Sequence, residues 1–303
     1  MPELPDVVNY CRALERLVVG QTLEKIQLSS PFLLRTVDPP LSVFHGKRLV
    51  TVSREAKQIV LEFDSGEKLL IHLMIAGRLR WRDSGAKVPK TNLQAGFQFE
   101  KGTLLFTEAG KKKRARLYAL PAGADALEPF QKGGLEVAGS TLKQFHKRLQ
   151  LRNHTLRRAL TDQSLFSGIG NAYSDEILFH AGLSPLKLTQ KMSDEEVKTL
   201  YQACRTVLKE WVDRLADEVG DGFPEKVTAF HPKMAVHGRY GEPCLKCGQA
   251  VQRIRYADNE TNYCPQCQNE GRLLADRSLS RLLKSDWPKT AEELEFHLET
   301  RRS

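Results

Sequence analysis

The hydrophobic positions at the start of the chain recur every three or four residues. From Val7 to Val18 they share one helical face, which predicts a helix over residues 5–19 with Gly20 as its C-terminal cap. The residues just ahead of this helix then lie at the positive end of its dipole. That position favours a carboxylate or a phosphate nearby.

From Thr22 to Leu120 the pattern changes to short apolar and β-branched runs separated by turn signals. Asp64-Ser65-Gly66 and Glu100-Lys101-Gly102 are typical of hairpin connections. Many short strands with regular turns predict an antiparallel sandwich or barrel, with the N-terminal helix packed on it. The expected strands cover residues 22–28, 49–53, 58–63, 68–74, 78–81, 96–99, 103–107 and 116–120.

After residue 134 the hydrophobic spacing is helical and stays so to about residue 219. Ser193 and Glu196 form a capping box ahead of the last helix. The turn Gly168-Ile169-Gly170-Asn171 joins two helices. Its glycines let a phosphate approach the backbone, and Asn171 can add its side chain, although an ordinary interhelix turn has the same pattern. The expected helices cover residues 141–149, 155–160, 172–180 and 194–215.

Four of the six cysteines form two Cys-x-x-Cys pairs separated by sixteen residues. An irregular segment over 219–235 precedes them, and residues 251–256 alternate like a strand of a hairpin between them. Two such pairs predict a closed, structural four-thiolate zinc site, since a redox dithiol needs one pair only. Cys11 and Cys204 stand alone in helical patterns, and we interpret them as core residues rather than reactive thiols. The expected zinc ligands are Cys244, Cys247, Cys264 and Cys267.

The length of 303 residues allows two or more domains. A net charge of +9 and a pI near 9.2 favour a polyanionic partner, nucleic acid before membrane, although a merely basic enzyme has the same charge. No run of about 18 apolar residues occurs, and the start lacks the regions of a secretory signal. We therefore expect no membrane association and, with this cysteine usage, a reducing compartment, the cytoplasm.

The first residues carry candidate chemistry. Pro2 allows removal of Met1, which exposes a secondary amine. When uncharged, this amine is a nucleophile toward a carbon such as C1′ of an opened sugar, and the iminium that forms is an electron sink. Glu3 beside it can act as a general acid/base. An N-terminus without any chemical role can have the same residues.

Two cationic features lie in the strand-rich region. Lys57 opens a strand, where a lysine is usually solvated. Residues 111–116 carry five positive charges in six positions. This run forms either a solvated loop or a hairpin tip that grips phosphate.

Together these pieces resemble the formamidopyrimidine-DNA glycosylase and endonuclease VIII family of base-excision repair enzymes. The resemblance covers about residues 2–267 and rests on the opening Met-Pro-Glu-Leu-Pro, on Lys57, on the turn 168–173 and on residues 238–243 ahead of the finger. It implies an α+β multidomain fold: an N-terminal helix with an antiparallel β-sandwich, a helix-two-turn-helix domain and a C-terminal β-hairpin zinc finger. The expected domains are residues 1–130 (catalytic), 134–235 (DNA-binding), 236–270 (zinc finger) and 271–303 (a helical tail of unknown role).

The resemblance also implies a bifunctional DNA glycosylase and AP lyase that flips out and excises a damaged, oxidised base. Pro2 would attack C1′, Glu3 would act as acid/base, and the strand would break by β,δ-elimination. Lys57 would bind the phosphate next to the lesion, and Asn171 would hold the backbone. One structural zinc ion, damaged DNA as partner, a monomeric state and a nucleoid-associated location belong to the same expectation. The other expected DNA contacts are His72, Met74, Ile75, Lys111, Lys112, Lys113, Arg114, Arg253 and Arg255.

The sequence departs from the family pattern in several places. Asp6 stands where the family usually has glutamate, and Asn259 stands where the finger usually carries a phosphate-gripping arginine. The loop over 108–114 lacks the aromatic residue that relatives insert into the duplex. Ile75, with Met74 just ahead of it, takes the place of a gap-filling methionine. These departures predict that the protein recognises the damaged base differently from its relatives and inserts side chains less effectively into the gap in the duplex.

Three other interpretations stay open: a relative specialised for single-stranded or unusually modified DNA, a non-catalytic damaged-DNA-binding protein, and a zinc-ribbon transcription factor. The presence of Pro2, Glu3 and Lys57 argues against the binder, because a binder needs no N-terminal amine. Asn259 argues mildly for it. A transcription factor would explain the finger but neither the N-terminus nor the β-rich region.

Overall fold

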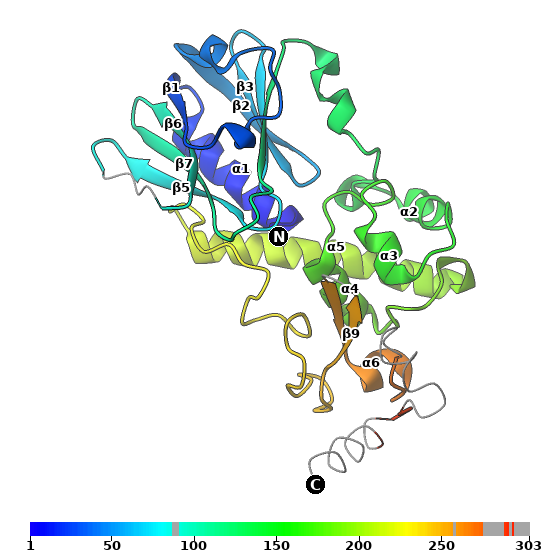
Figure 1. The fold of residues 1–303 in the computed structure, drawn as a ribbon. Coiled ribbons are helices and arrows are strands. Elements are labelled where there is room, and N and C mark those ends of the chain that lie inside the picture. Colours follow the sequence, from blue (N-terminus) through cyan, green and yellow to red (C-terminus); the bar gives the residue numbers. More distant parts are fainter. Residues whose placement is uncertain (87–90, 257–258, 275–287, 291–292, 294–303) are drawn as a thin grey trace. The chain divides into compact units, whose positions relative to one another are not determined.

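The structure is a computed structural model of the 303-residue chain, and it describes residues 1–86, 91–256, 259–274, 288–290 and 293 (Figure 1). The chain divides into two compact units. We call residues 1–132 with 210–228 the N-terminal unit, and residues 133–209 with 229–303 the C-terminal unit.

The N-terminal unit begins with helix α1, Leu4–Val18, and continues as antiparallel strands (Figure 1). The two hairpin signals are confirmed. A turn at residues 64–66 connects the paired strands β3 and β4, and β6 pairs with β7 up to Phe99 and Gly102. Short 3₁₀ segments cover Pro31–Leu33, Leu41–Phe44 and Ala124–Phe130. The strands are β1 (Thr22–Leu28), β2 (Lys47–Glu55), β3 (Gln58–Phe63), β4 (Lys68–His72), β5 (Gly77–Asp83), β6 (Leu93–Phe99), β7 (Gly102–Glu108) and β8 (Arg116–Leu120).

The strands pair in the order β5-β7-β6-β1-β2-β3-β4-β8. Two residue pairs, Thr22 with Arg48 and Leu23 with Lys47, connect the first four strands to the last four. The buried faces of both halves and of α1 contribute to one hydrophobic core, to which Val7, Leu61 and Phe97 belong. The predicted antiparallel sandwich with a packed N-terminal helix is therefore confirmed.

The C-terminal unit holds the predicted helices and the finger (Figure 1). The 3₁₀ segment Val137–Gly139 precedes α2, and a second one, Thr189–Lys191, lies between α4 and α5. Helix α5 begins in this unit and ends in the N-terminal unit. The elements are α2 (Leu142–Leu149), α3 (Leu156–Thr161), α4 (Asn171–Ala181), α5 (Asp194–Val219), β9 (Gln252–Tyr256), β10 (Asn259–Tyr263) and α6 (Pro265–Asn269).

The helix ends follow their sequence signals. Ser193 and Glu196 form the predicted capping box: the Ser193 N–H donates to Glu196 Oε2 (2.9 Å), and the Glu196 N–H donates to Ser193 Oγ (3.3 Å). Fully buried aromatic rings fill the space between the helices, with Phe145 and Phe166 4.8 Å apart at their centroids. Cys204 is buried and Cys11 half-buried, which agrees with core positions for both.

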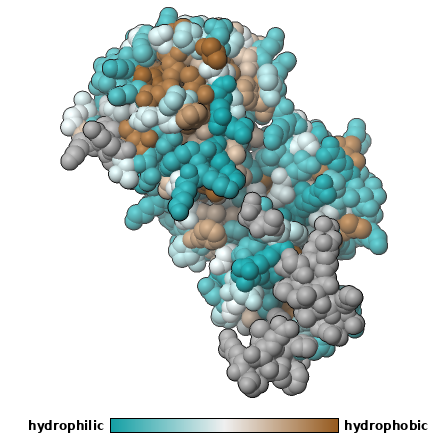
Figure 2. Space-filling view, in the orientation of Figure 1, coloured by the Kyte–Doolittle hydropathy of each residue, from teal (hydrophilic) through white to brown (hydrophobic). Residues whose placement is uncertain are grey.

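The expected helical tail over 271–303 lies mostly outside the described residues. Within the described part of the chain, no helix is long and apolar enough to cross a membrane. In the surface view, hydrophilic residues cover much of the visible face, and one group of hydrophobic residues gathers on the N-terminal unit (Figure 2).

Candidate functional site

The N-terminal residues are folded against the first turn of α1. Pro2 is buried, and Glu3, the residue that precedes the helix, is 2% exposed. The Glu3 N–H donates to Asp6 Oδ2 at 2.8 Å. This bond fixes the backbone next to Pro2, so that the start of the chain is an ordered part of the fold.

Burial weakens the basicity of the amino terminus. The pKa of the Met1 amino group lies below its ordinary value, mainly because burial penalises the charged form; Glu3 and Asp6 oppose this effect, while Arg78 and Lys57 reinforce it. In a chain without Met1 the amine belongs to Pro2, one residue farther into the same surroundings. An uncharged amine keeps the lone pair that a nucleophile needs.

Burial also shifts the pKa values of two side chains of the N-terminal unit, Asp6 and Lys57. The pKa of Asp6 rises to about 7, because the carboxyl group is fully buried; the Glu3 N–H bond opposes the rise, and the charge of Glu3 adds to it. The pKa of Lys57 is lowered by burial, against the attraction of Glu3. Lys57 is only 8% exposed, which excludes the solvated interpretation of this lysine.

The position of Lys57 differs slightly from the expectation. It lies in the turn one residue before β3, following Ala56, which has a left-handed backbone (φ +51°). Across the sheet, Gln58 pairs with His72, and His72 pairs with Arg116. Three neighbouring strands thus carry these residues at one level of the sheet.

His72 is half-buried among cations. Its pKa falls to about 4, first because of burial and then because of Arg116, Lys132 and Lys57. The imidazole is therefore neutral near pH 7, and the positive charges around it remain available to an anion. Arg116 and Lys132 join this positive region without having been singled out in the sequence.

Met74 and Ile75 lie in the turn between β4 and β5, because β4 ends at His72 instead of continuing to residue 74 as expected. Met74 has a left-handed backbone (φ +53°), and Ile75 is 51% exposed. The Arg78 guanidinium donates to the carbonyls of Ile75 (3.2 Å), Gly77 (2.7 Å) and Val227 (2.7 Å). These bonds fix the turn and present Ile75 at its surface.

The cationic loop after β7, residues 111–114, is anchored by hydrogen bonds to one buried residue, Glu108. Glu108, 1% exposed, accepts the N–H groups of Arg114 (2.8 Å) and Ala115 (3.1 Å) at Oε1, and the Lys113 ammonium donates to its carbonyl. Residues 111–114 are exposed. Of the two alternatives for this run, the solvated loop agrees with the structure and the hairpin tip is wrong: β7 pairs with β5 and β6, and β8 pairs with β4, so the loop connects the two halves of the sandwich. A phosphate contact from this loop stays a prediction.

In the C-terminal unit, the turn before α4 is held by one amide side chain. Gln163 accepts from the Gly168 N–H (3.0 Å) and donates to the Ile169 carbonyl (2.7 Å). Gly168 has φ +80°, a conformation that favours glycine. The turn therefore delivers Asn171 as the first residue of α4, at the positive end of that helix.

Asn171 belongs to a group of polar side chains that the sequence reasoning did not find. Its Oδ1 accepts from Arg157 Nη2 (3.1 Å), and its Nδ2 donates to Asn259 Oδ1 (2.9 Å). Arg157 Nη2 also donates to the Glu260 carbonyl (3.2 Å), and the guanidinium lies over the Tyr256 ring at 5.1 Å. No local pattern marks Arg157, because its partners are 14 and 103 residues away.

The two finger arginines differ in their surroundings. The Arg253 guanidinium lies over the Tyr240 ring at 4.0 Å and forms an ion pair with Glu260 at 3.7 Å. Arg255 is exposed. A DNA contact from either residue stays a prediction.

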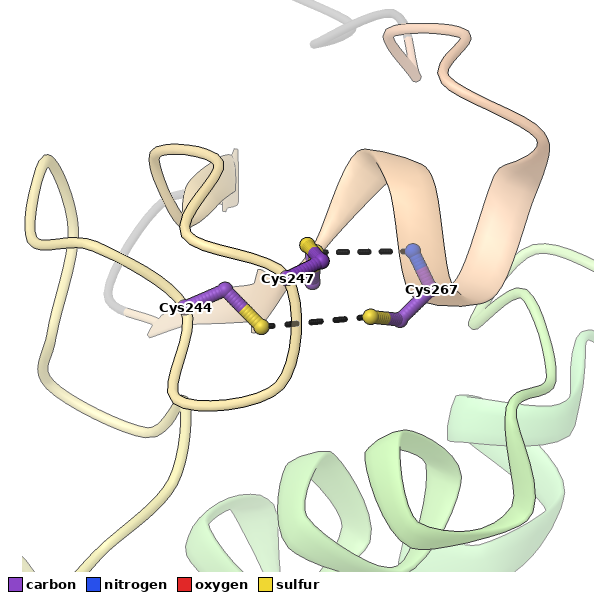
Figure 3. Close-up of side chains that lie close together, drawn as sticks. Cys244, Cys247 and Cys267 are labelled. Carbon is purple, nitrogen blue, oxygen red and sulfur yellow. Dashed lines mark hydrogen bonds between the residues drawn. The ribbon is translucent and has the colours of Figure 1, made fainter.

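The four cysteines converge as the spacing predicts. Figure 3 shows three of them, Cys244, Cys247 and Cys267, close together. All four sulfur atoms lie within 4.8 Å of one another; Cys244 and Cys267 are 3.9 Å apart, and Cys247 and Cys264 are 3.4 Å apart. Four thiolates with zinc–sulfur bonds of about 2.3 Å have sulfur–sulfur distances of about 3.8 Å. The backbone N–H groups of Lys246 and Cys267 point at Cys244 and Cys264, at 3.4 Å each. The geometry fits one tetrahedral structural zinc ion with no position left for water.

Known families match along the chain. The formamidopyrimidine-DNA glycosylase N-terminal domain matches residues 1–114, the H2TH domain of the same enzymes matches residues 135–220, and the zinc finger found in FPG and IleRS matches residues 241–269. The formamidopyrimidine-DNA glycosylase of Heliobacterium modesticaldum is 34% identical over 283 residues, 88% of this chain and 100% of that protein. The chain belongs to the formamidopyrimidine-DNA glycosylase family. The expected enzyme class, a DNA glycosylase with AP lyase activity, is confirmed, and so is the structural zinc.

Solved structures of the family agree with this assignment. The Thermus thermophilus protein is 32% identical with a TM-score of 0.75, covering 89% of this chain and all of that one. The Lactococcus lactis enzyme bound to DNA containing an abasic site is 26% identical with a TM-score of 0.77, covering 88% of this chain and 99% of that one. Family membership excludes a transcription factor that shares only the finger.

Proposed function

We propose that this protein excises an oxidised base from DNA through a Schiff base formed by Pro2. The observation that carries this proposal is the buried start of the chain: Pro2 and Glu3 are both buried, and burial lowers the pKa of the Met1 amino group that precedes them. A related structure has bound DNA containing an 8-oxoguanine analogue. An oxidised purine is therefore the substrate class that we propose.

The proposed chemistry uses three residues of the N-terminal unit. The Pro2 nitrogen attacks C1′ as the bond to the base breaks, and the base leaves with a proton. The attached amine then loses its proton, and the C1′–O4′ bond breaks as O4′ takes up a proton, which opens the sugar and leaves an iminium between Pro2 and C1′. The iminium acidifies the C2′ hydrogen; removal of that proton expels the 3′ phosphate. A second elimination, which removes the C4′ proton, expels the 5′ phosphate. Glu3 acts as the acid/base mainly in the first step, the release of the base, and Lys57 binds a phosphate next to the lesion. Water finally hydrolyses the Schiff base and frees the amine.

The remaining expected residues take part in DNA binding in this proposal. His72 and the loop 111–114 contribute to phosphate binding on the N-terminal unit, and Asn171 does so on the C-terminal unit. Ile75 fills part of the gap that the flipped base leaves. We also propose that the protein acts as a monomer on the DNA of the cytoplasmic nucleoid, with domain boundaries near residues 130, 235 and 270.

Borohydride trapping on an oligonucleotide with an abasic site tests the nucleophile. Reduction should give a covalent protein–DNA adduct, and peptide mapping should place it on residue 2. Pro2→Gly is not a decisive variant, because glycine also offers an N-terminal amine. An adduct that maps to Lys57 or to another lysine would overturn the assignment.

A further inference from the structure

The side chain of Arg78 connects two segments of the N-terminal unit that are far apart in the chain. One is the turn over 73–77, which carries Ile75; the other is the segment 221–228, which follows α5 and contains no helix or strand. Arg78 Nε donates to the Val227 carbonyl (2.7 Å), 149 residues later, and Nη1 donates to the Ile75 carbonyl (3.2 Å). The guanidinium therefore holds both segments by their backbones.

The turn over 73–77 is already closed by its own backbone. The Gly77 N–H donates to the Leu73 carbonyl at 2.9 Å. A Cβ atom at Gly77 would lie 2.3 Å from that carbonyl oxygen, so only glycine fits there. The bonds from Arg78 therefore do not create the turn, but attach a preformed turn to the segment 221–228.

The segment 221–228 depends on side chains for its position, because it belongs to no helix or strand. Contacts with α1 and β5 hold it: Arg16 donates to the Gly222 carbonyl (2.7 Å), the rings of Tyr10 and Phe223 are 5.7 Å apart at their centroids, and Arg82 pairs with Glu225 (2.5 Å). These contacts tie the segment to the body of the unit and not to the turn over 73–77. Arg78 supplies the connection to the turn.

We propose that Arg78 is a positioning residue for excision from duplex DNA, which holds Ile75 and the segment 221–228 in one fixed relation. The inference rests on the proposed function, because it assumes that Ile75 fills the gap left by the flipped base. A side chain that enters a base stack loses conformational freedom, and so does the turn that carries it. Arg78 imposes this order in the free protein, so that less is lost when DNA binds.

The charge of Arg78 is the competing explanation. The pKa of the Met1 amino group is lowered first by burial, and the charge of Arg78 adds to this effect while that of Glu3 opposes it. Loss of this charge alone would leave less uncharged amine and would slow the reaction on single and double strands alike. Loss of the connection would instead affect duplex DNA, because a single strand has no gap between stacked base pairs.

The assay measures affinity for a duplex and for a single strand, each with a tetrahydrofuran abasic-site analogue that cannot react with the amine. The readout is the ratio of the two affinities. Arg78→Gln should lower this ratio about tenfold, as expected for the loss of one hydrogen bond from a charged donor. Arg80→Gln is the matched control: it removes the same charge two residues along β5 and should leave the ratio unchanged.

Arg78→Lys separates the connection from the charge. Lysine keeps the charge but offers one nitrogen atom, which cannot take the places of both Nε and Nη1. The ratio should therefore fall nearly as far as in Arg78→Gln, and borohydride trapping on a single-stranded abasic site should stay that of the wild type. Melting temperatures show that each variant is folded, and Arg78→Lys carries the test if Arg78→Gln does not fold.

The proposal is wrong if Arg78→Lys keeps the wild-type ratio, because charge would then explain the effect. It is also wrong if Arg80→Gln lowers the ratio equally, or if both affinities of a less stable Arg78→Gln fall together. Borohydride trapping of the wild type separates this result from the proposed function. Trapping at residue 2 with an unchanged ratio in Arg78→Gln overturns the positioning role only, whereas a lowered ratio without any trapping overturns the proposed chemistry only.

Discussion

Asp6 gives the clearest quantitative prediction, because its carboxyl group is fully buried beside the proposed catalytic residues. Burial raises its pKa from 3.8 to about 7, so the folded protein holds this proton more tightly than the unfolded chain does. The stability from this group is therefore fully present below pH 3.8 and is lost as the pH rises through about 7. The two pKa values correspond to a loss of about 2.5 kcal/mol of unfolding free energy between pH 5 and pH 8.

Asp6→Asn removes this dependence without removing the hydrogen bond. The amide oxygen can still accept the Glu3 N–H, but the side chain cannot ionise. The stability of Asp6→Asn relative to the wild type should therefore rise by about 2.5 kcal/mol between pH 5 and pH 8. Urea unfolding at pH 5, 6, 7 and 8 measures this difference, and the exposed Asp125→Asn should follow the wild type at every pH.

A direct measurement checks the cause. The ¹³C chemical shift of the Asp6 side-chain carboxyl carbon (Cγ) should titrate with a midpoint near 7. A stability difference that does not change between pH 5 and pH 8, together with a ¹³C midpoint near the ordinary value of aspartate, would show that water reaches this carboxyl group. The reasoning from burial would then fail for the whole N-terminal region, including the proposed uncharged amine.

Further predictions concern the reaction, the metal and the DNA. Glu3→Gln should lose base excision, because no acid remains for the departing base, but should keep cleavage of a ready-made abasic site; loss of both activities would refute this division of roles. Metal analysis should find about one zinc per chain, and Cys247→Ser should lose the zinc and weaken DNA binding, so full affinity in metal-free protein would contradict a structural role. Wild-type binding to duplex DNA should have a log–log salt slope of roughly −4 to −5, and replacing Lys111, Lys112 and Lys113 with alanine should lower the affinity for single and double strands alike. If that variant instead loses excision from duplex DNA only, or if the wild type is active with only one base opposite the lesion, the loop inserts into the duplex as a wedge.

The sequence predicted most of the fold because most of its elements are encoded locally. β1, β3 and β8 have the expected bounds, and the turn at residues 64–66 carries its own hairpin signal. The role of the cationic loop could not be predicted in this way. Its position depends on β8 pairing with β4, about 45 residues earlier in the chain, and no local pattern encodes that partner.

The candidate site shows the same division between local and long-range information. Spacing alone identified the cysteines, because zinc fixes the geometry of its own ligands. The burial of Lys57 and the raised pKa of Asp6 arise from packing, which residue type does not reveal. Arg157 is the strongest case, because its environment is created only when the finger hairpin docks on α3 and α4. A substitution at Asn259 therefore also changes the surroundings of Arg157, because Asn171 accepts from Arg157 and donates to Asn259.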